Sequence, residues 1–245
     1  MRLTRNASFL AVILLAGFVP PARPDEGKEV KETALDAPLS VKVKVRMEGP
    51  YTADVPLQVV CYFKYTPEGA KRMSGAPVEL DKHLGGVIAS LRERGDFTGD
   101  DLETFLITPT AGSIKAKALL LIGLGDEASL SLDKMERVGK TAVREASRLG
   151  ARKVAFAPLI RDQGNSKFGT GEIASAVVRG VFLAYDTERR LQKENLARDF
   201  TLDEWWQEAG PAFFDETAGA AEKAITQANA AIAERSSAPY TGDKK

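Results

Sequence analysis

The stretch KALLLIGL, residues 117–124, decides the fold. Its apolar side chains follow one another without the alternation of a half-exposed strand, which is typical of a strand buried on both faces of a sheet. Such a strand needs a layer of helices on each side, because neither of its faces can meet water. We therefore expect an α/β fold in which helices precede and follow this strand.

Amphipathic helices are predicted on both sides of the strand. In each of them apolar side chains recur at three- and four-residue steps, which places them on one side of a helix. Gly95 and Gly150 end the first two helices, and Ser131 or Leu132 begins the second. The predicted helices cover residues 78–95, 131–150 and 171–191.

Four further strands are predicted. Residues 39–47, LSVKVKVRM, alternate valine with lysine or arginine, so one face is apolar and the other cationic. We interpret this segment as a half-buried strand near an edge, whose lysines discourage pairing with another chain. The more apolar residues 55–64 predict a central strand, and the remaining strands cover 102–107 and 154–159. Strands that alternate with helices predict a three-layer α/β/α domain with a mixed, largely parallel sheet.

Four segments lie within this pattern: PVELDKHLGGVIASLRERGDFTG (77–99), KALLLIGLGD (117–126), GARKVAFAPL (150–159) and GEIASAVVRGVFLAYDTERR (171–190). In order and spacing they resemble the amino-terminal domain of the M17 leucine aminopeptidase family. The resemblance covers roughly half of the chain. It implies a macro-domain-like fold, in which a mixed sheet lies between helical layers.

The same resemblance implies where the chemistry of that family is found. A second, metal-binding domain carries the lysine, the acidic residues and the arginine that hold two metals and do the chemistry. Its signature segment NTDAEGRL has no counterpart here, because none of Asn6, Asn165, Asn195 and Asn229 opens an N-T-D run. The resemblance therefore carries over no catalytic residue and no metal ligand, and we expect a non-catalytic protein without a cofactor.

The ends of the chain predict export and a helical extension. Arg2 and Arg5 precede a short apolar run that prolines then break, which is the order of a secretory signal peptide. The run is too short to span a bilayer comfortably, so we expect a secreted or periplasmic protein with no stable membrane anchor after cleavage. The predicted organisation is a signal peptide over 1–22, a flexible spacer over 23–38, the α/β domain over 39–200, and a helical extension with a frayed tail over 201–245.

Composition excludes several classes of function. Lys plus Arg and Asp plus Glu are balanced at 34 each, which gives no electrostatic reason to expect nucleic acid. The sole cysteine, Cys61, cannot form an internal disulfide and is predicted to be a buried, inert thiol. With His83 as the sole histidine, multi-histidine zinc sites are excluded and only an all-oxygen metal site stays open. We interpret His83 as a partly buried structural residue.

The segment GLGDEA, residues 123–128, formally matches the G-x-G-x-x-[G/A] pattern of dinucleotide-binding turns. Asp126 and Glu127, however, put two negative charges where the phosphates would lie, and they suit a helix amino terminus equally well without a ligand. We predict a strand-ending turn, with Gly123 and Gly125 as weak candidates for binding a nucleotide-like ligand. Further glycines, at 112, 164, 169 and 171, mark loops for a cleft at the carboxyl ends of the strands.

Aromatic side chains are concentrated in the segment LDEWWQEAGPAFF, residues 202–214. We expect Trp205, Trp206, Phe213 and Phe214 to fold back and cover the sheet or a helical layer. The alternative is an exposed patch that binds a protein partner, because Trp and Phe are enriched in interface cores. An alanine-rich helix is predicted over 217–235.

These observations predict an exported, non-catalytic binding or scaffold protein. One alternative is an accessory or regulatory subunit of a separately encoded M17 metalloaminopeptidase. Another is macro-domain-like binding or hydrolysis of an ADP-ribose-type ligand. An oligomer is compatible with all three.

Overall fold

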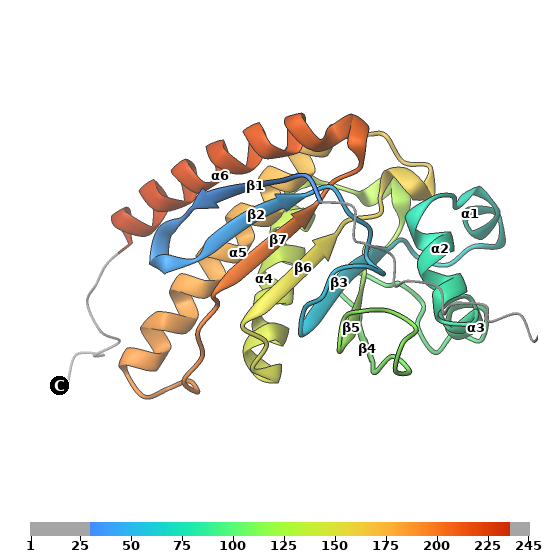
Figure 1. Cartoon of the computed structure of the whole chain (residues 1–245), viewed down its shortest axis with the longest axis horizontal. Helices are drawn as coiled ribbons and strands as arrows, with labels where there is room; N and C mark the ends of the chain where they lie inside the picture. Colours follow the sequence, from blue (N-terminus) through green and yellow to red (C-terminus); the bar gives the residue numbers. More distant parts are fainter. Residues whose placement is uncertain (1–29, 236–245) are drawn as a thin grey trace, which may run out of the picture.

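The computed structural model describes residues 30–235 as one α/β domain. Its strands are β1 (Glu32–Asp36), β2 (Lys42–Arg46), β3 (Leu57–Tyr62), β4 (Thr104–Ile107), β5 (Leu119–Gly123), β6 (Lys153–Ala157) and β7 (Glu204–Glu208). They form a seven-stranded sheet in the order β1-β2-β7-β6-β3-β5-β4 (Figure 1). The strands from β2 to β5 in this order run parallel, whereas the edge strands β1 and β4 are antiparallel to their neighbours. The predicted mixed, largely parallel sheet is confirmed.

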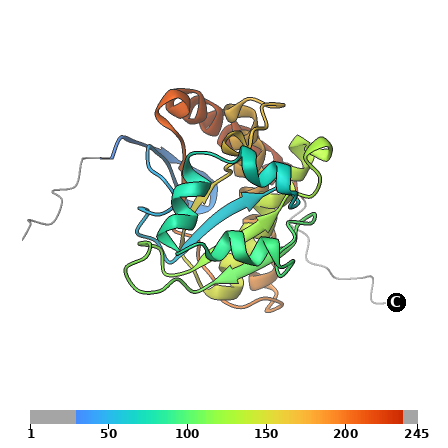
Figure 2. The same ribbon diagram turned by 90° about the vertical axis from the view of Figure 1, so that its right-hand side faces the viewer.

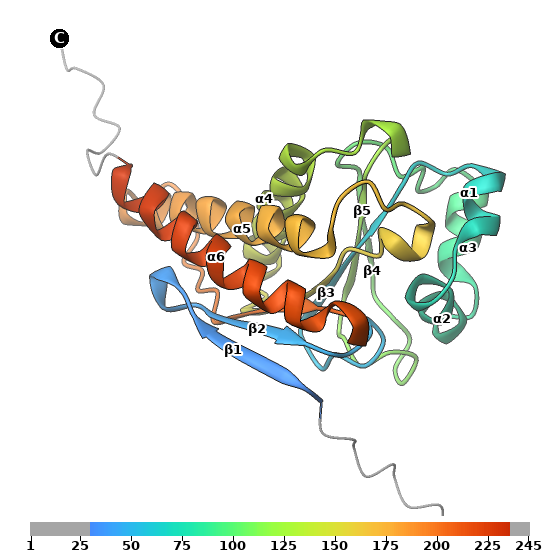
Figure 3. The ribbon, with the colours of Figure 1, turned by 90° about the horizontal axis from the view of Figure 1, so that it is seen from above.

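Helices cover both faces of this sheet. They are α1 (Pro67–Arg72), α2 (Ala76–His83), α3 (Val87–Glu93), α4 (Leu132–Leu149), α5 (Thr170–Lys193) and α6 (Phe214–Glu234). Figure 3 shows α4, α5 and α6 side by side on one face, with α6 lying over β2. The shorter helices α1 to α3 gather on the other face, which is turned toward the viewer in Figure 2. The three-layer architecture follows from strands whose two faces are both apolar.

Two apolar clusters form the core, one on each face of the sheet. The cluster beneath α4, α5 and α6 includes Trp205, whose ring stacks on Phe156 with 5.6 Å between centroids. The cluster beneath α2 and α3 includes Tyr62, Phe97 and Trp206. Neighbouring residues of β7 thus contribute one tryptophan to each face, as the alternation of a strand requires.

Helix α4 lies where the sequence predicts it, because both of its ends are encoded locally. The Ser131 side chain accepts a hydrogen bond from the backbone N–H of Lys134, and Gly150 takes the left-handed conformation with φ of 68°. At its crossing with α5 two glycines let the helix backbones touch. A Cβ on Gly180 would lie 2.0 Å from the carbonyl oxygen of Glu136, and one on Gly139 would lie 2.3 Å from that of Val177.

The single helix predicted over 78–95 is wrong, since the structure divides it into α2 and α3. Gly85 and Gly86 have φ values of 69° and 83°, which a right-handed helix does not accommodate. The Asp81 side chain then accepts hydrogen bonds from the backbone N–H groups of Ile88 and Ala89, at 2.7 and 3.3 Å. The apolar spacing continues through the break because both helices face the same core.

The flexible spacer predicted over 23–38 is corrected within its described part. Residues 32–36 form β1, which pairs with β2 from Glu32 opposite Arg46 to Asp36 opposite Lys42. Strand β2 is half-buried, as predicted, but the outermost position belongs to β1. The polar sequence ETALD does not predict a strand by itself, because the pairing with β2 is what makes these residues a strand.

The helical extension predicted from residue 201 is also corrected. Residues 204–208 form β7, which lies between β2 and β6 inside the sheet, so the α/β domain does not end at residue 200. The helix that follows is α6, close to its predicted position. The predicted signal peptide and the tail beyond residue 235 lie outside the described residues. Between residues 30 and 235 no helix has the length and apolar character to cross a membrane.

Candidate functional site

A cavity of about 470 Å³ opens at the carboxyl ends of β2, β7 and β6. We call it the strand-end cavity. Its walls come from the loops after these three strands, at residues 47–50, 157–162 and 208–211, together with Ala76, Thr170, Ile173 and Phe213. Its position is the usual one for ligands in open α/β sheets, and its volume lies within the range of about 300–1,000 Å³ that small-molecule sites occupy.

Four charged side chains line the strand-end cavity, and three of them are acidic: Glu48, Asp162 and Glu208. The fourth is Arg161, at the start of the short 3-10 segment Arg161–Gln163. Its Nε donates a hydrogen bond to the Thr170 hydroxyl at 3.0 Å, and its guanidinium lies 4.7 Å from the centre of the Phe213 ring. The single cation of the wall is therefore already engaged by neighbouring side chains.

Glu208 is the most unusual of these residues. It ends β7 and is 5% exposed; both of its carboxylate oxygens are shielded from solvent, and the side chain of Gln58 lies within reach of them. Burial raises the pKa of Glu208 well above its ordinary value, and the nearby charge of Glu48 raises it further. The amide of Gln58 and the guanidinium of Arg46 act in the opposite direction but do not outweigh burial. Burial therefore favours the neutral, protonated form of Glu208.

The other two acids are also held in poorly solvated positions. Burial raises the pKa of Glu48, although its ion pair with Arg46 opposes the shift. Burial likewise raises the pKa of Asp162, which accepts a hydrogen bond from the backbone N–H of Ala76 at 3.2 Å. Burial thus raises the pKa of all three carboxyl groups of the wall.

A pH dependence of stability follows from Glu208. Because its pKa is raised above the value of about 4.3 expected in the unfolded chain, the folded state binds the proton more tightly, and stability falls as pH rises above that value. We expect Glu208→Gln to reduce this fall, measured by urea denaturation from pH 5 to 8. Glu222→Gln, at an exposed position on α6, is the control. Equal pH profiles for wild type and Glu208→Gln would contradict the expectation.

The glycine turn that the sequence singled out lies elsewhere. Gly123 and Gly125 do not line the strand-end cavity. A Cβ on Gly123 would lie 2.0 Å from the carbonyl oxygen of Asp100, so the close approach of two backbones accounts for this glycine. Gly125 has φ of 66°, donates its N–H to Gly99 at 2.8 Å and accepts the N–H of Lys64 at 2.9 Å. Both glycines thus have a conformational role.

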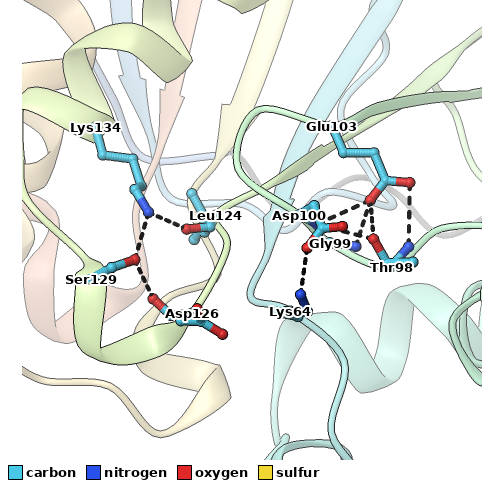
Figure 4. Close-up of polar contacts among 9 residues, drawn as sticks. All are labelled: Lys64, Thr98, Gly99, Asp100, Glu103, Leu124, Asp126, Ser129 and Lys134. Atoms are coloured by element: carbon cyan, nitrogen blue, oxygen red, sulfur yellow. Dashed lines mark hydrogen bonds and ion pairs between the residues drawn. The ribbon is translucent and has the colours of Figure 1, made fainter.

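The polar groups around this turn form hydrogen bonds with side chains of the protein (Figure 4). Lys134 donates from Nζ to the Leu124 carbonyl at 2.7 Å and to the Ser129 hydroxyl at 2.8 Å, and that hydroxyl donates to the Asp126 carbonyl. Across the turn, the Glu103 carboxylate accepts from the Thr98 hydroxyl at 2.7 Å and from the backbone N–H groups of Thr98, Gly99 and Asp100. This arrangement supports the strand-ending turn that the sequence predicts, and the alternative of nucleotide binding stays untested.

Replacing Gly125 by Ala should lower the melting temperature by several degrees while removing no nucleotide affinity. The left-handed conformation costs an L-residue about 1–2 kcal/mol. Gly125→Asn is the matched control, since Asn adopts this conformation more readily and should retain more stability. Calorimetry follows the melting, and titration with ADP-ribose or NAD tests binding. Micromolar nucleotide affinity of the wild type, lost in Gly125→Ala, would overturn the structural interpretation.

Two further residues that the sequence singled out, His83 and Cys61, do not line the strand-end cavity. His83 is exposed, so its predicted partial burial is wrong. It is the last residue of α2, next to the break at Gly85 and Gly86, and its ring stacks on that of Tyr51 with 4.7 Å between centroids. Cys61 is fully buried, as predicted, and burial raises the pKa of its thiol. In the part of the chain that the structure describes, no three His, Cys, Asp or Glu side chains gather as metal ligands.

The aromatic segment contributes mainly to the core. Trp205, Trp206 and Phe214 are buried, which confirms that they cover the sheet and its helical layer. The Trp206 ring lies beneath the Arg46 guanidinium, 4.0 Å away. Phe213 is half-buried and lines the strand-end cavity. A protein partner bound through these four aromatic residues stays a prediction.

Sequence reasoning missed all three acids of the cavity. Glu48, Asp162 and Glu208 lie in three separate loops or strand ends, and no motif joins them. One signal was present: acidic residues flank the tryptophan pair in EWWQE, and a strand buried on both faces must bury part of that charge.

Comparison with known sequences supports a family assignment. The family described as the cytosol aminopeptidase family, N-terminal domain, matches residues 59–195. A probable cytosol aminopeptidase of Persephonella marina is 33% identical over 128 residues, which are 51% of this chain and 25% of that protein. One from Alkaliphilus oremlandii is 30% identical over 143 residues, which are 56% of this chain and 28% of that protein. The chain thus spans about a quarter of the length of these curated relatives.

Solved structures support the fold. A leucine aminopeptidase mutant from tomato superposes with a TM-score of 0.55 and 18% identity, covering 84% of this chain and 38% of that one. A macrodomain of Oceanobacillus iheyensis, solved with ADP, superposes with a TM-score of 0.55 and 9% identity, covering 82% of this chain and all of that one. At these identities the likeness shows the macro-domain-like fold alone.

Proposed function

Because this chain belongs to the cytosol aminopeptidase family through the amino-terminal domain of that family, we propose that it is an exported, non-catalytic protein that binds a small molecule. Its binding site is the strand-end cavity. The matches to curated relatives cover their amino-terminal domain and not the metal-binding catalytic one. We therefore look for the binding site in the domain that it has in common with them.

The strand-end cavity is the observation that carries the proposal. Its wall combines apolar residues, such as Leu159, Ile173 and Phe213, with a few convergent polar groups, which is the usual composition of a small-molecule site. Glu208, a buried acidic residue at the end of β7, also lies in this wall.

A screen of small-molecule fragments by thermal shift tests the proposal. The screen is run on the wild type and on a variant with a bulky side chain in the cavity wall. Gly210 lines the cavity with φ of −68°, and a Cβ there meets no atom closer than 4.0 Å, so Gly210→Leu should fold and add a bulky side chain to the cavity wall. Gly219→Leu, on α6 with no atom within 4 Å of its Cβ, is the control. We expect fragments that stabilise wild type and Gly219→Leu but not Gly210→Leu. A complete lack of such fragments would overturn the site.

Export is supported by the order of residues 1–22, in which two arginines precede a short apolar run. Expression of the full chain in a bacterial host, followed by fractionation and amino-terminal sequencing of the product, tests it. We expect a periplasmic product cleaved near Ala22. A cytoplasmic product that retains its first residues would contradict export.

We expect no aminopeptidase activity from the purified protein. Hydrolysis by two metal ions needs a cluster of side chains that binds both ions. The resemblance to the aminopeptidase family assigns no such metal ligand to a residue of this chain. Release of p-nitroaniline from leucine p-nitroanilide, with Zn²⁺ or Mn²⁺ added, is the measurement. Metal-dependent turnover that survives rigorous purification and disappears on replacing an acidic residue of this chain would disprove the expectation.

A further inference from the structure

We propose that the strand-end cavity binds an uncharged, largely apolar molecule and disfavours ligands of either charge. This inference rests on the proposed function, because it assigns a ligand class to the same cavity. It requires in addition that the ligand carry no ionised acid and no ammonium group, which the proposed function does not.

Two of the four charged side chains in the wall are withheld from a ligand. The Glu48 side chain is 6% exposed and forms an ion pair with Arg46 at 2.5 Å. Glu208 is buried, both of its carboxylate oxygens are shielded from solvent, and the side chain of Gln58 lies within reach of them. Neither carboxyl group is therefore available to receive a cation that enters the cavity.

The other two charged side chains are engaged by groups of the chain itself. Asp162 accepts a hydrogen bond from the backbone N–H of Ala76 at 3.2 Å, in the first turn of α2, where the helix dipole favours a negative charge. Arg161 is exposed to solvent, and its guanidinium contacts Thr170 and Phe213. Because the charge of Arg161 remains in water, an ion pair with it would add little to the affinity of a ligand.

The amino terminus of α5, which borders the cavity at Thr170, is also occupied. Backbone N–H groups at the start of a helix ordinarily attract anions. Here the N–H of Gly169 donates to the Glu172 carboxylate at 2.7 Å. The N–H of Gly171 donates to the Glu216 carboxylate, also at 2.7 Å. Two carboxylates of the chain thus lie where an anionic group of a ligand would bind, and they repel a further negative charge.

Much of the remaining wall is apolar. The residues that contribute apolar side chains are Met47, Pro50, Ala157, Leu159, Ile173 and Phe213. An ion that entered this space would lose its water without gaining a buried partner of opposite charge, which is very costly. An uncharged apolar molecule has no such cost, and burial of its surface supplies affinity. The wall therefore matches a neutral ligand better than a ligand of either charge.

Calorimetric titration of the protein with two matched pairs of indoles tests the proposal. Tryptamine carries an ammonium group, which is replaced by an amide in N-acetyltryptamine. Indole-3-acetate carries a carboxylate, which is replaced by an ester in methyl indole-3-acetate. At neutral pH we expect each neutral compound to bind about tenfold more tightly than its charged counterpart, or better, because the charged group would lose its water without a partner.

Two glycine variants show whether these compounds bind in the cavity. Gly210→Leu, which adds a bulky side chain to the wall, should weaken the binding of both neutral indoles severalfold. The control Gly219→Leu, on α6, should leave both affinities unchanged. If Gly210→Leu does not fold, the preference of the wild type for the neutral member of each pair decides alone.

A variant of Glu216 tests the contribution of the α5 amino terminus. Glu216→Gln removes the negative charge that now lies beside the N–H of Gly171. We expect a smaller preference for methyl indole-3-acetate over indole-3-acetate in this variant. The control Glu222→Gln, at an exposed position on α6, should keep the wild-type preference. An unchanged preference in Glu216→Gln would overturn the role assigned to this carboxylate.

The outcomes separate the two proposals. A charged indole that binds as tightly as its neutral counterpart, or more tightly, would overturn the ligand class and leave the binding site standing. Binding of the neutral indoles that survives Gly210→Leu would place them outside the cavity and also overturn the ligand class. If none of the four indoles binds at millimolar concentration, the ligand class falls, and the fragment screen then decides the cavity separately.

Discussion

Cutting the chain after Leu191 should abolish its cooperative unfolding transition. The cut removes β7 and α6, and with β7 the hydrogen bonds that join β2 to β6 through the sheet. It also removes Trp205 and Trp206, and a fully buried aromatic side chain contributes roughly 1.5–3 kcal/mol against a total stability of about 5–15 kcal/mol. The exposed core should give an aggregating or molten product, detected by the loss of near-ultraviolet circular dichroism and by dye binding.

A chain that ends at Arg235 is the control for this truncation. It retains β7 and all of α6, so its melting should match that of the full chain. A soluble product of the shorter truncation, with an unchanged cooperative melt, would show that β7 and its tryptophans are dispensable. In that case the aromatic segment would have to serve a partner instead of the core.

The second large effect is expected from Gly180→Ala. The added methyl group would lie 2.0 Å from the carbonyl oxygen of Glu136 on α4, so the two helices must move apart. Overpacking of this kind costs about 1–3 kcal/mol and sometimes more, and here the obstacle is backbone that cannot rotate away. Chemical denaturation should show a lower midpoint with an unchanged slope.

Gly219→Ala is the matched control, since it makes the same change inside a helix where no atom lies within 4 Å. It should raise stability by up to about 1 kcal/mol, because Ala is the better helix former. Opposite signs for the two substitutions would attribute the loss to the α4–α5 contact. A neutral Gly180→Ala would mean that this crossing has room to adjust.

Much of the fold is encoded in short segments. The apolar run of residues 117–124 predicts a central strand, and Ser131 and Gly150 predict both ends of α4, because these signals act through neighbouring residues. The two missed strands share one cause. Strand β7 has the polar sequence EWWQE, and only its position between β2 and β6 makes it a buried strand. Likewise β1 becomes a strand through pairing with β2.

The candidate site was less predictable than the fold for the same reason. A cleft at the carboxyl ends of the strands follows from the fold class, but its chemistry depends on which strands are neighbours. Glu208 lies opposite Arg46 because β7 pairs with β2, and this pairing brings it close to Glu48. No local pattern in the sequence contains that information. The prominent glycine turn, in contrast, is a local pattern and has a local, conformational role.

The position of β7 also sets the order in which a newly made chain can fold. Lys42 pairs with Glu204, so a strand made early by the ribosome waits for one made near the end of synthesis. Topologies with such distant partners fold slowly, because a long loop must close before its contacts form. Until β7 arrives, the facing edges of β2 and β6 remain open to other chains, which is a known route to aggregation. The nascent protein therefore depends on being kept apart from its own copies until its last strand is complete.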